Sequence, residues 1–304
     1  LDRFASASTS FVDLDWHDAS RDRPVPARLH LPVRREGSPA PSPLVVFSHG
    51  LGGSRMGYQW LGSYWAANGV ASLHVQHVGS DRTVWSERGN PLALLGRLHE
   101  AANEREAIAR VRDLRFAIDR LAGTSFSATI DTRRVVAAGH SYGANTVLLA
   151  SGARVDREEI DARLADSRIA AAILISAPPF HGEGPANQIL SRIAIPTLHV
   201  TATEDVIRLP GFYSDVNDRI ALFEATPGPD KTLVVYSGGA HSMFTDRMSP
   251  GGEAVNSAVK AATRELALGF VERAISGRPE RLAGWRDRHA SLVAQYVEAG
   301  RKST

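Results

Sequence analysis

Cysteine is missing from all 304 residues of this chain, which rules out disulfides, cysteine-ligated zinc and a thiolate nucleophile. Long hydrophobic runs are missing too. Stretches such as residues 44–47 and 169–175 fall far short of the roughly 20 apolar residues that cross a bilayer. The charges are nearly balanced, with 35 basic and 33 acidic residues. The sequence contains no stripe of basic residues with aromatic residues between them. We therefore expect no transmembrane segment and no nucleic-acid partner.

The chain does contain short apolar runs that alternate with amphipathic segments. The strand-like runs are LVVFS, VASLHV, RRVVAAG, IAAAILIS, IPTLHVT and KTLVVYS. Between the second and third of them, residues 100–123 repeat apolar side chains at helical spacing. This alternation predicts an α/β protein with a mostly parallel central sheet and helices on both faces. We predict one domain over residues 1–304, with N-terminal strands at about 11–33 and a C-terminal surface helix at about 281–298.

A serine flanked by glycines follows the third run. Ser141 lies in Gly139-His140-Ser141-Tyr142-Gly143, between a predicted strand and a predicted helix. This G-x-S-x-G pentad is common by chance, but a strand–turn–helix context is what a nucleophilic serine on a sharp turn requires. A glycine-flanked turn without chemistry is the plainer alternative.

A base and an acid are available after later strands. His241 follows the final predicted strand in SGGAHSMF, and Asp205 follows IPTLHVT. A serine hydroxyl needs a base beside it, and the base needs a carboxylate that holds its tautomer. The order Ser141, Asp205, His241 is that of an α/β-hydrolase, and all three follow strands whose carboxyl ends should share one sheet edge.

The segment FSHGLGG supplies candidates for an oxyanion hole. It directly follows the first buried strand, and its glycines would let the backbone turn beneath a bound carbonyl group. We expect the backbone amides of Leu51 and Tyr142 to be the two donors. A plain glycine-rich turn is the alternative.

These segments together resemble the α/β-hydrolase superfamily. The resemblance rests on VVFSHGLGGSR, AAGHSYGANT, LHVTATEDV and GGAHSMF, and it extends from about residue 26 to residue 270. The nearest branch contains dienelactone-hydrolase-like and platelet-activating-factor-acetylhydrolase-like serine esterases, with polyester hydrolases as more distant relatives. The resemblance implies a serine carboxyl-ester hydrolase without a cofactor.

The chain departs from these relatives in two ways. True dienelactone hydrolases use a cysteine nucleophile, which this chain lacks, so that substrate is not expected. Acetylhydrolases of the platelet-activating-factor type take their acid from the loop after the preceding strand, which here holds only Glu183. Asp205 is the preferred acid because it begins a loop at a strand end, Glu183 is the alternative, and Glu204 is a third choice.

Other side chains suggest pocket or metal functions. Tyr58 and Trp85 are candidates for lining an acyl or aromatic pocket, and Met243, two residues after His241, is a third. His74 and His77 have an i, i+3 spacing, but at a strand end they cannot easily face one ion, so we expect no metal.

We therefore predict a serine esterase that acts on small acyl or aryl esters or on polyesters. A silent hydrolase fold that only binds a ligand, and a serine amidase or peptidase, are the alternatives. The start at Leu1 and the habits of the relatives favour a secreted or periplasmic protein freed of a signal peptide, with the cytoplasm as the alternative. The oligomeric state is not readable from the sequence.

Overall fold

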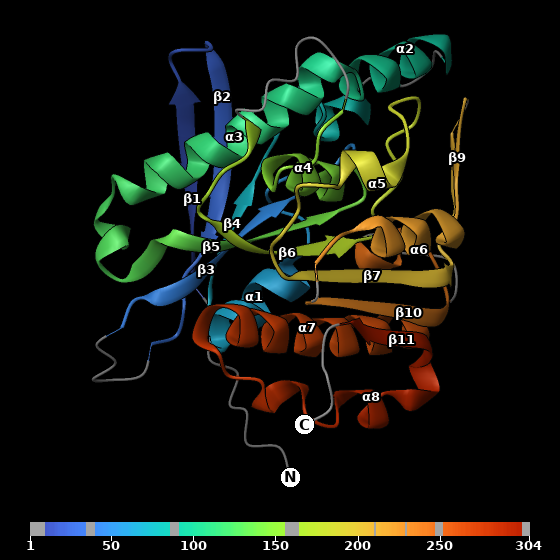
Figure 1. Cartoon of the computed structure of the whole chain (residues 1–304). Helices are drawn as coiled ribbons and strands as arrows, with labels where there is room; N and C mark the ends of the chain where they lie inside the picture. The colour runs from blue at the N-terminus through green and yellow to red at the C-terminus, as the bar shows by residue number, and fades with distance from the viewer. Residues whose placement is uncertain are drawn as a thin grey trace.

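The structure is a computed structural model that describes residues 10–34, 40–85, 91–155, 164–209, 211–228, 230–246 and 252–299. Its centre is a nine-stranded sheet in the order β1-β2-β4-β3-β5-β6-β7-β10-β11 (Figure 1). The pairings from β4 to β10 are parallel, and those at the two ends are antiparallel. The strands are β1 (Phe11–Asp18), β2 (Arg23–His30), β3 (Ser42–Ser48), β4 (Ala71–Val75), β5 (Ile130–His140), β6 (Ile169–Ile175), β7 (Thr197–Glu204), β10 (Lys231–Ala240) and β11 (Val293–Ala299).

Helices cover both faces of the sheet (Figure 1). One face carries α1 (Gln59–Ala67) and α7 (Glu253–Ser276). The other carries α3 (Glu104–Ala122), α4 (Tyr142–Ala150), α5 (Ala186–Ile189) and α6 (Val216–Ala225), with α2 (Pro91–Ala101) beyond α3. Each face buries its own apolar cluster, and this arrangement confirms the predicted α/β-hydrolase fold class.

Shorter elements complete the described chain. A small hairpin of β8 (Ile207–Leu209) and β9 (Phe212–Ser214) projects beyond β7. The other short elements are the 3₁₀ turns Arg82–Trp85, Ser125–Ala128, His241–Phe244, Glu280–Leu282 and Ala290–Leu292, and helix α8 (Trp285–Arg288).

The parallel strands place the candidate residues at one edge. Because β3, β5, β7 and β10 run in the same direction, the residues that follow them meet at their common carboxyl edge. Ser141, Asp205 and His241 immediately follow β5, β7 and β10. Open parallel sheets bind their ligands at this edge.

The predicted C-terminal helix over residues 281–298 is wrong. The segment forms only short turns and α8 before β11, which pairs antiparallel with β10. Trp285 is fully buried, and its indole N–H donates to the Ala262 carbonyl of α7 at 3.1 Å, which anchors the segment. Tyr296 and Val297 then pair with Val234 and Leu233, so the segment covers an edge that β10 would otherwise leave unpaired. Tertiary pairing here overrides the local helical pattern.

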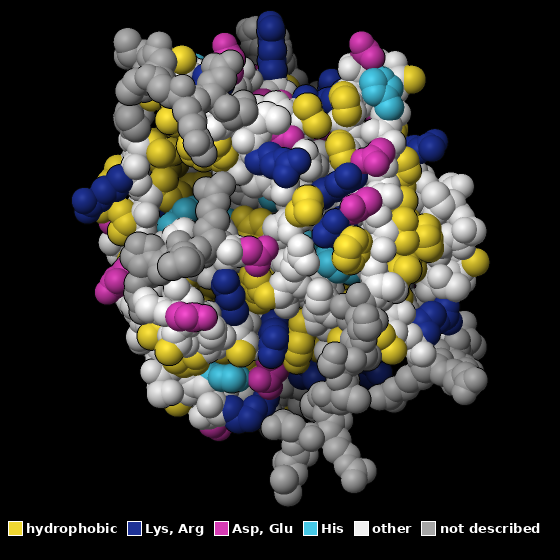
Figure 2. Space-filling model, turned by 180° about the vertical axis from the view of Figure 1, so that it is seen from behind, with side chains coloured by type: hydrophobic (Ala, Val, Ile, Leu, Met, Phe, Trp, Pro, Cys, Tyr) yellow, Lys and Arg dark blue, Asp and Glu magenta, His cyan; other side chains and the backbone are white. Residues whose placement is uncertain are grey.

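The charges on the surface are mixed. On the face in Figure 2, Lys and Arg side chains lie among Asp and Glu side chains. Among the helices that the structure describes, none combines the length and the apolar character needed to cross a bilayer.

Candidate active site

Ser141 stands on a sharp turn between β5 and α4. Its backbone has φ +55° and ψ −124°, a conformation that costs free energy unless the surrounding contacts enforce it. A Cβ at Gly139 would lie 2.3 Å from the Gly143 carbonyl oxygen, and one at Gly143 would lie 2.0 Å from the Ser48 carbonyl oxygen. Only glycine therefore fits at both flanking positions. The Ser141 amide donates to the Ile175 carbonyl at 2.9 Å, which fixes the turn against β6.

His241 connects Ser141 to a buried carboxylate. Its Nε2 lies 2.9 Å from the Ser141 hydroxyl oxygen, and its Nδ1 lies 2.7 Å from Oδ1 of Asp205. A carboxylate only accepts hydrogen bonds, so neutral His241 carries its proton on Nδ1 and turns the Nε2 lone pair toward the serine hydroxyl. The structure thus brings together the three side chains that the sequence suggested. Their arrangement can transfer a proton from the hydroxyl to the imidazole.

Asp205 is fully buried and held in place by several groups. Its Oδ2 accepts a hydrogen bond from the Thr201 hydroxyl at 2.7 Å and lies 3.5 Å from Nε of the buried Arg219 of α6. Burial alone would raise the pKa of this carboxyl. The hydrogen bond and charge of His241, the Arg219 guanidinium and the Ser176 hydroxyl together hold its pKa well below the usual range. Asp205 therefore stays ionised next to the imidazole.

The two other candidate acids lie elsewhere. Glu204 ends β7 with an exposed side chain, and Glu183 lines the cavity beside Ser141. The carboxylate bonded to the His241 ring is that of Asp205.

Leu51 and Tyr142 are the two residues whose amides are expected to be oxyanion donors. Both residues and Ser141 line the same cavity, and a Cβ at Gly50 would lie only 3.3 Å from the Ser141 Cβ. The Leu51 N–H donates to no other group of the described chain. Tyr142 is the first residue of α4, so its backbone N–H lies at the N-terminus of that helix. The Leu51 amide can therefore be offered to an oxygen bound in the cavity.

Arg110 of α3 fixes the loop that precedes Leu51. Its fully buried guanidinium donates to the His49 carbonyl, to the Ser48 hydroxyl at 3.1 Å and to the Ser80 hydroxyl at 2.7 Å. Its Nε donates to the Thr146 hydroxyl at 2.9 Å, so the same side chain ties the loop to α4. Four of the five guanidinium N–H groups of Arg110 therefore donate to backbone or hydroxyl oxygens around the site.

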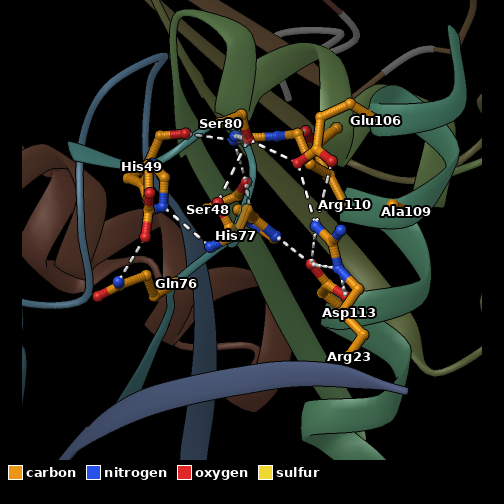
Figure 3. A network of polar contacts seen from close by, with 12 residues as sticks. Arg23, Ser48, His49, Gln76, His77, Ser80, Glu106, Ala109, Arg110 and Asp113 are labelled. Carbon is orange, nitrogen blue, oxygen red and sulfur yellow. Dashed lines mark hydrogen bonds and ion pairs between the residues drawn. The ribbon is translucent and has the colours of Figure 1, made fainter. Parts of the chain in front are cut away.

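The contacts of Arg110 continue into a wider buried network (Figure 3). His77 lies 2.9 Å from the Ser48 hydroxyl through Nε2 and 3.1 Å from Asp113 through Nδ1. Asp113 in turn accepts from Arg23 of β2 at 3.0 Å, and the His77 amide donates to Nε2 of His49 at 3.1 Å. The loop after β3 is therefore connected to the N-terminal hairpin through the buried side chains of His77 and Asp113 and the partly exposed side chain of Arg23.

Tyr58 and His140 connect the two sides of the site. Burial lowers the pKa of His140 to about 3, so its ring is neutral and has one donor and one acceptor nitrogen. Nε2 lies 3.2 Å from the His241 carbonyl, which only accepts, so the proton is on Nε2 and Nδ1 accepts from the Tyr58 hydroxyl at 2.8 Å. The Tyr58 oxygen accepts from the Gly50 amide at 3.3 Å. The predicted pocket role of Tyr58 is wrong, because this side chain packs in the core on the α1 and α7 face.

A cavity of about 380 Å³ opens beside Ser141. Its walls come from α2, α3, α4, the loop after β6 and the hairpin of β8 and β9, and they are mainly apolar. The apolar lining residues include Leu98, Ala107, Leu149, Val155, Pro178 and Phe180.

The two other predicted pocket residues do not line this cavity within the described part of the chain. Met243 is fully buried in the core of the α1 and α7 face, where its sulfur packs against Gly239. Trp85 is partly exposed and donates its indole N–H to the Gly52 carbonyl at 3.1 Å, so it supports the loop that carries Leu51. Both residues are close in sequence to the site, but this closeness does not show on which face of the sheet or on which side of a loop a side chain lies.

His74 and His77 do not face a common ion. His74 lies between the Gly57 carbonyl at 3.1 Å and the Ser72 hydroxyl at 2.8 Å, whereas His77 belongs to the Arg110 network. Among the described residues no group of three or more His, Asp or Glu side chains is arranged to hold a metal ion.

Residues 22–88 match the sequence model of the family described as platelet-activating factor acetylhydrolase, isoform II. The match includes β2, β3, β4 and the loop that carries Leu51, and it ends before Ser141. With the mostly parallel sheet, it confirms the resemblance to acetylhydrolase-like α/β-hydrolases and supports a hydrolase that acts on esters. No curated protein matches the chain.

Proposed function

We propose that this α/β-hydrolase is a serine carboxyl-ester hydrolase with Ser141, His241 and Asp205 as its catalytic triad. The observation that carries the proposal is the continuous hydrogen-bonded chain from the Ser141 hydroxyl through His241 to Asp205, at 2.9 and 2.7 Å. The match to an acetylhydrolase family over residues 22–88 supports the same type of enzyme.

In the proposed mechanism, Ser141 Oγ attacks the ester carbonyl carbon while Nε2 of His241 takes its proton. Asp205 stabilises the resulting imidazolium and keeps the ring oriented. His241 then protonates the leaving alcohol, and the acyl group remains on Ser141. Water deprotonated by His241 attacks this acyl-enzyme, and the acid leaves as Ser141 regains its proton.

The negative charge of the tetrahedral intermediates falls on the former carbonyl oxygen. We assign the Leu51 and Tyr142 amides as its hydrogen-bond donors, supported by the place of both residues in the wall of the cavity that contains Ser141. One donor of this kind contributes about 100- to 1000-fold to kcat in related chemistry. The cavity of about 380 Å³ is near the small end of ligand pockets, which favours small acyl or aryl esters over bulky ones.

A fluorophosphonate probe tests the proposal directly. The Ser141 oxygen should displace fluoride from phosphorus, and mass spectrometry should place the adduct on the peptide that contains Ser141. Hydrolysis of 4-nitrophenyl acetate should decline in proportion to labelling. The unfolded chain, which has the same serines without the triad, should remain unlabelled. A folded protein that binds the ester but neither reacts nor turns over would be a binding protein.

The charge of Arg219 should be visible in the pH dependence of activity. Arg219 partly neutralises Asp205, whose negative charge stabilises protonated His241, while neighbouring His140 is neutral. In Arg219→Met this positive charge is absent and protonated His241 is stabilised more, so the acidic limb of the pH profile of kcat/KM should move to higher pH. Arg219→Lys should return most of the shift. An equal loss of activity at every pH, with no movement of the limb, would mean that Arg219 acts only on packing.

A further inference from the structure

The cavity wall contains one buried amide among apolar neighbours. Asn145 of α4 lines the cavity and is only 8% exposed, and its side-chain Oδ1 is buried without a hydrogen-bond partner in the described chain. Other polar lining residues, such as His99 and His181, are exposed at the mouth. Leu149, one turn further along α4, continues the wall with an apolar side chain.

An amide in this position is unfavourable for folding alone. Burial removes the hydrogen bonds that the amide would make to water, and no group of the described chain donates a hydrogen bond to Oδ1. From Ala144 to Ala150 every residue of α4 is buried, so an apolar side chain of similar shape would suit the helix better. The amide oxygen can therefore accept a hydrogen bond from a molecule that occupies the cavity.

Asn145 lies one turn beyond Ser141, the residue that precedes α4. Its backbone N–H lies 3.4 Å from the Ser141 carbonyl oxygen, and both residues line the cavity. Helix side chains lean toward the N-terminus of their helix, which for α4 is the end next to Ser141. A substrate group that is attached to the scissile ester and occupies the cavity can therefore reach Asn145.

We infer that Asn145 is a specificity-determining residue, and that the preferred substrate carries a hydrogen-bond donor, a hydroxyl group, a few carbons from the ester that Ser141 attacks. The inference rests on the proposed esterase function. The group is a hydroxyl, because the unpaired Asn145 Oδ1 only accepts hydrogen bonds and a hydroxyl can donate one. Such a hydroxyl could belong to the acyl part or to the alcohol part of the ester.

Two pairs of isosteric esters separate these sources. The acyl pair is 4-nitrophenyl 3-hydroxypropanoate and 4-nitrophenyl butanoate. The alcohol pair is 2-hydroxyethyl acetate and propyl acetate. Within each pair one hydroxyl group replaces one methyl group. The ratio of kcat/KM for the hydroxy ester to that for its hydrocarbon partner is measured in the wild type and in Asn145→Leu, so intrinsic reactivity differences cancel.

In one of the two pairs the ratio should be roughly 5- to 10-fold lower in Asn145→Leu than in the wild type, because the variant loses one buried hydrogen bond. The pair that responds identifies the side of the ester, acyl or alcohol, that Asn145 contacts. Asn145→Ala serves as the second variant if the leucine does not fit, and it should lower the same ratio. Leu149→Ala, which enlarges the same wall without changing its polarity, should leave both ratios unchanged.

Ratios that are the same in wild type, Asn145→Leu and Asn145→Ala for both pairs would overturn the role of Asn145, although hydrolysis of all four esters would still support the esterase. If the folded wild type hydrolyses none of the four and does not react with the fluorophosphonate, the proposed function itself fails. The two failures are therefore distinguishable.

Discussion

Replacement of Ser141 by alanine should lower kcat for ester hydrolysis by about 10⁵- to 10⁶-fold. Alanine removes the oxygen that forms the acyl-enzyme in the proposed mechanism, while the His241–Asp205 pair at 2.7 Å and the strained turn between Gly139 and Gly143 remain. The residual rate should come from the cavity and the backbone donors acting on water. The residual rate can be measured with 4-nitrophenyl acetate at enzyme concentrations high enough to detect it.

Two controls make the Ser141 result specific. Ser127→Ala changes an exposed serine before β5, at the opposite edge of the sheet from the site, and should keep wild-type activity. The thermal midpoint of Ser141→Ala should stay near that of the wild type, because its hydroxyl is not part of the core. If a folded Ser141→Ala protein retained more than a tenth of the activity, another group would be the nucleophile.

Replacement of Asp205 by asparagine should lower kcat by about 10⁴-fold. The asparagine amide can donate to Nδ1 of His241, which would move the imidazole proton to Nε2 and leave no lone pair facing Ser141. The variant keeps the size of the side chain, so the protein should remain folded. The loss should appear in kcat more than in KM, because substrate does not contact Asp205.

Glu183→Gln is the matched control for the acid. Glu183 lines the cavity, so its variant should change KM by a few-fold and leave kcat close to the wild type. The opposite pattern, with kcat lost in Glu183→Gln and kept in Asp205→Asn, would assign the acid to the loop after β6 and would require that loop to move toward His241.

The parts of the site that the sequence predicted are those attached to strand ends. Ser141, Asp205 and His241 each follow an apolar run, and a parallel sheet brings such positions to one edge whatever the helices do. The side chains that support them were not predicted. Arg110 and Arg219 lie within helical segments, where a charged residue is normally a solvated one, and only the packed structure shows that both guanidinium groups are buried.

Local patterns failed where distant segments decide the outcome. Tyr58 is close in sequence to the Leu51 loop, but its ring turns to the opposite face of the sheet and its hydroxyl bonds to His140. The segment 281–298 has apolar residues at intervals that suit a helix, yet pairing with β10 makes its last part a strand. Neither the sheet face nor the strand partner is encoded within a short window of sequence.

The network that joins Arg110 to Asp113 and Arg23 has a consequence for reactivity. Because the buried Arg110 guanidinium binds the His49 carbonyl in the folded protein, the loop that carries Leu51, the proposed oxyanion donor, is held in place before any ligand binds. An already oriented dipole needs no rearrangement when charge develops on the substrate oxygen, whereas water molecules in solution must reorient. This difference lowers the activation free energy of the enzymatic reaction. Weakening the contact between Asp113 and Arg23 of the N-terminal hairpin should therefore lower the turnover rate of the bound ester and leave the affinity for the substrate almost unchanged.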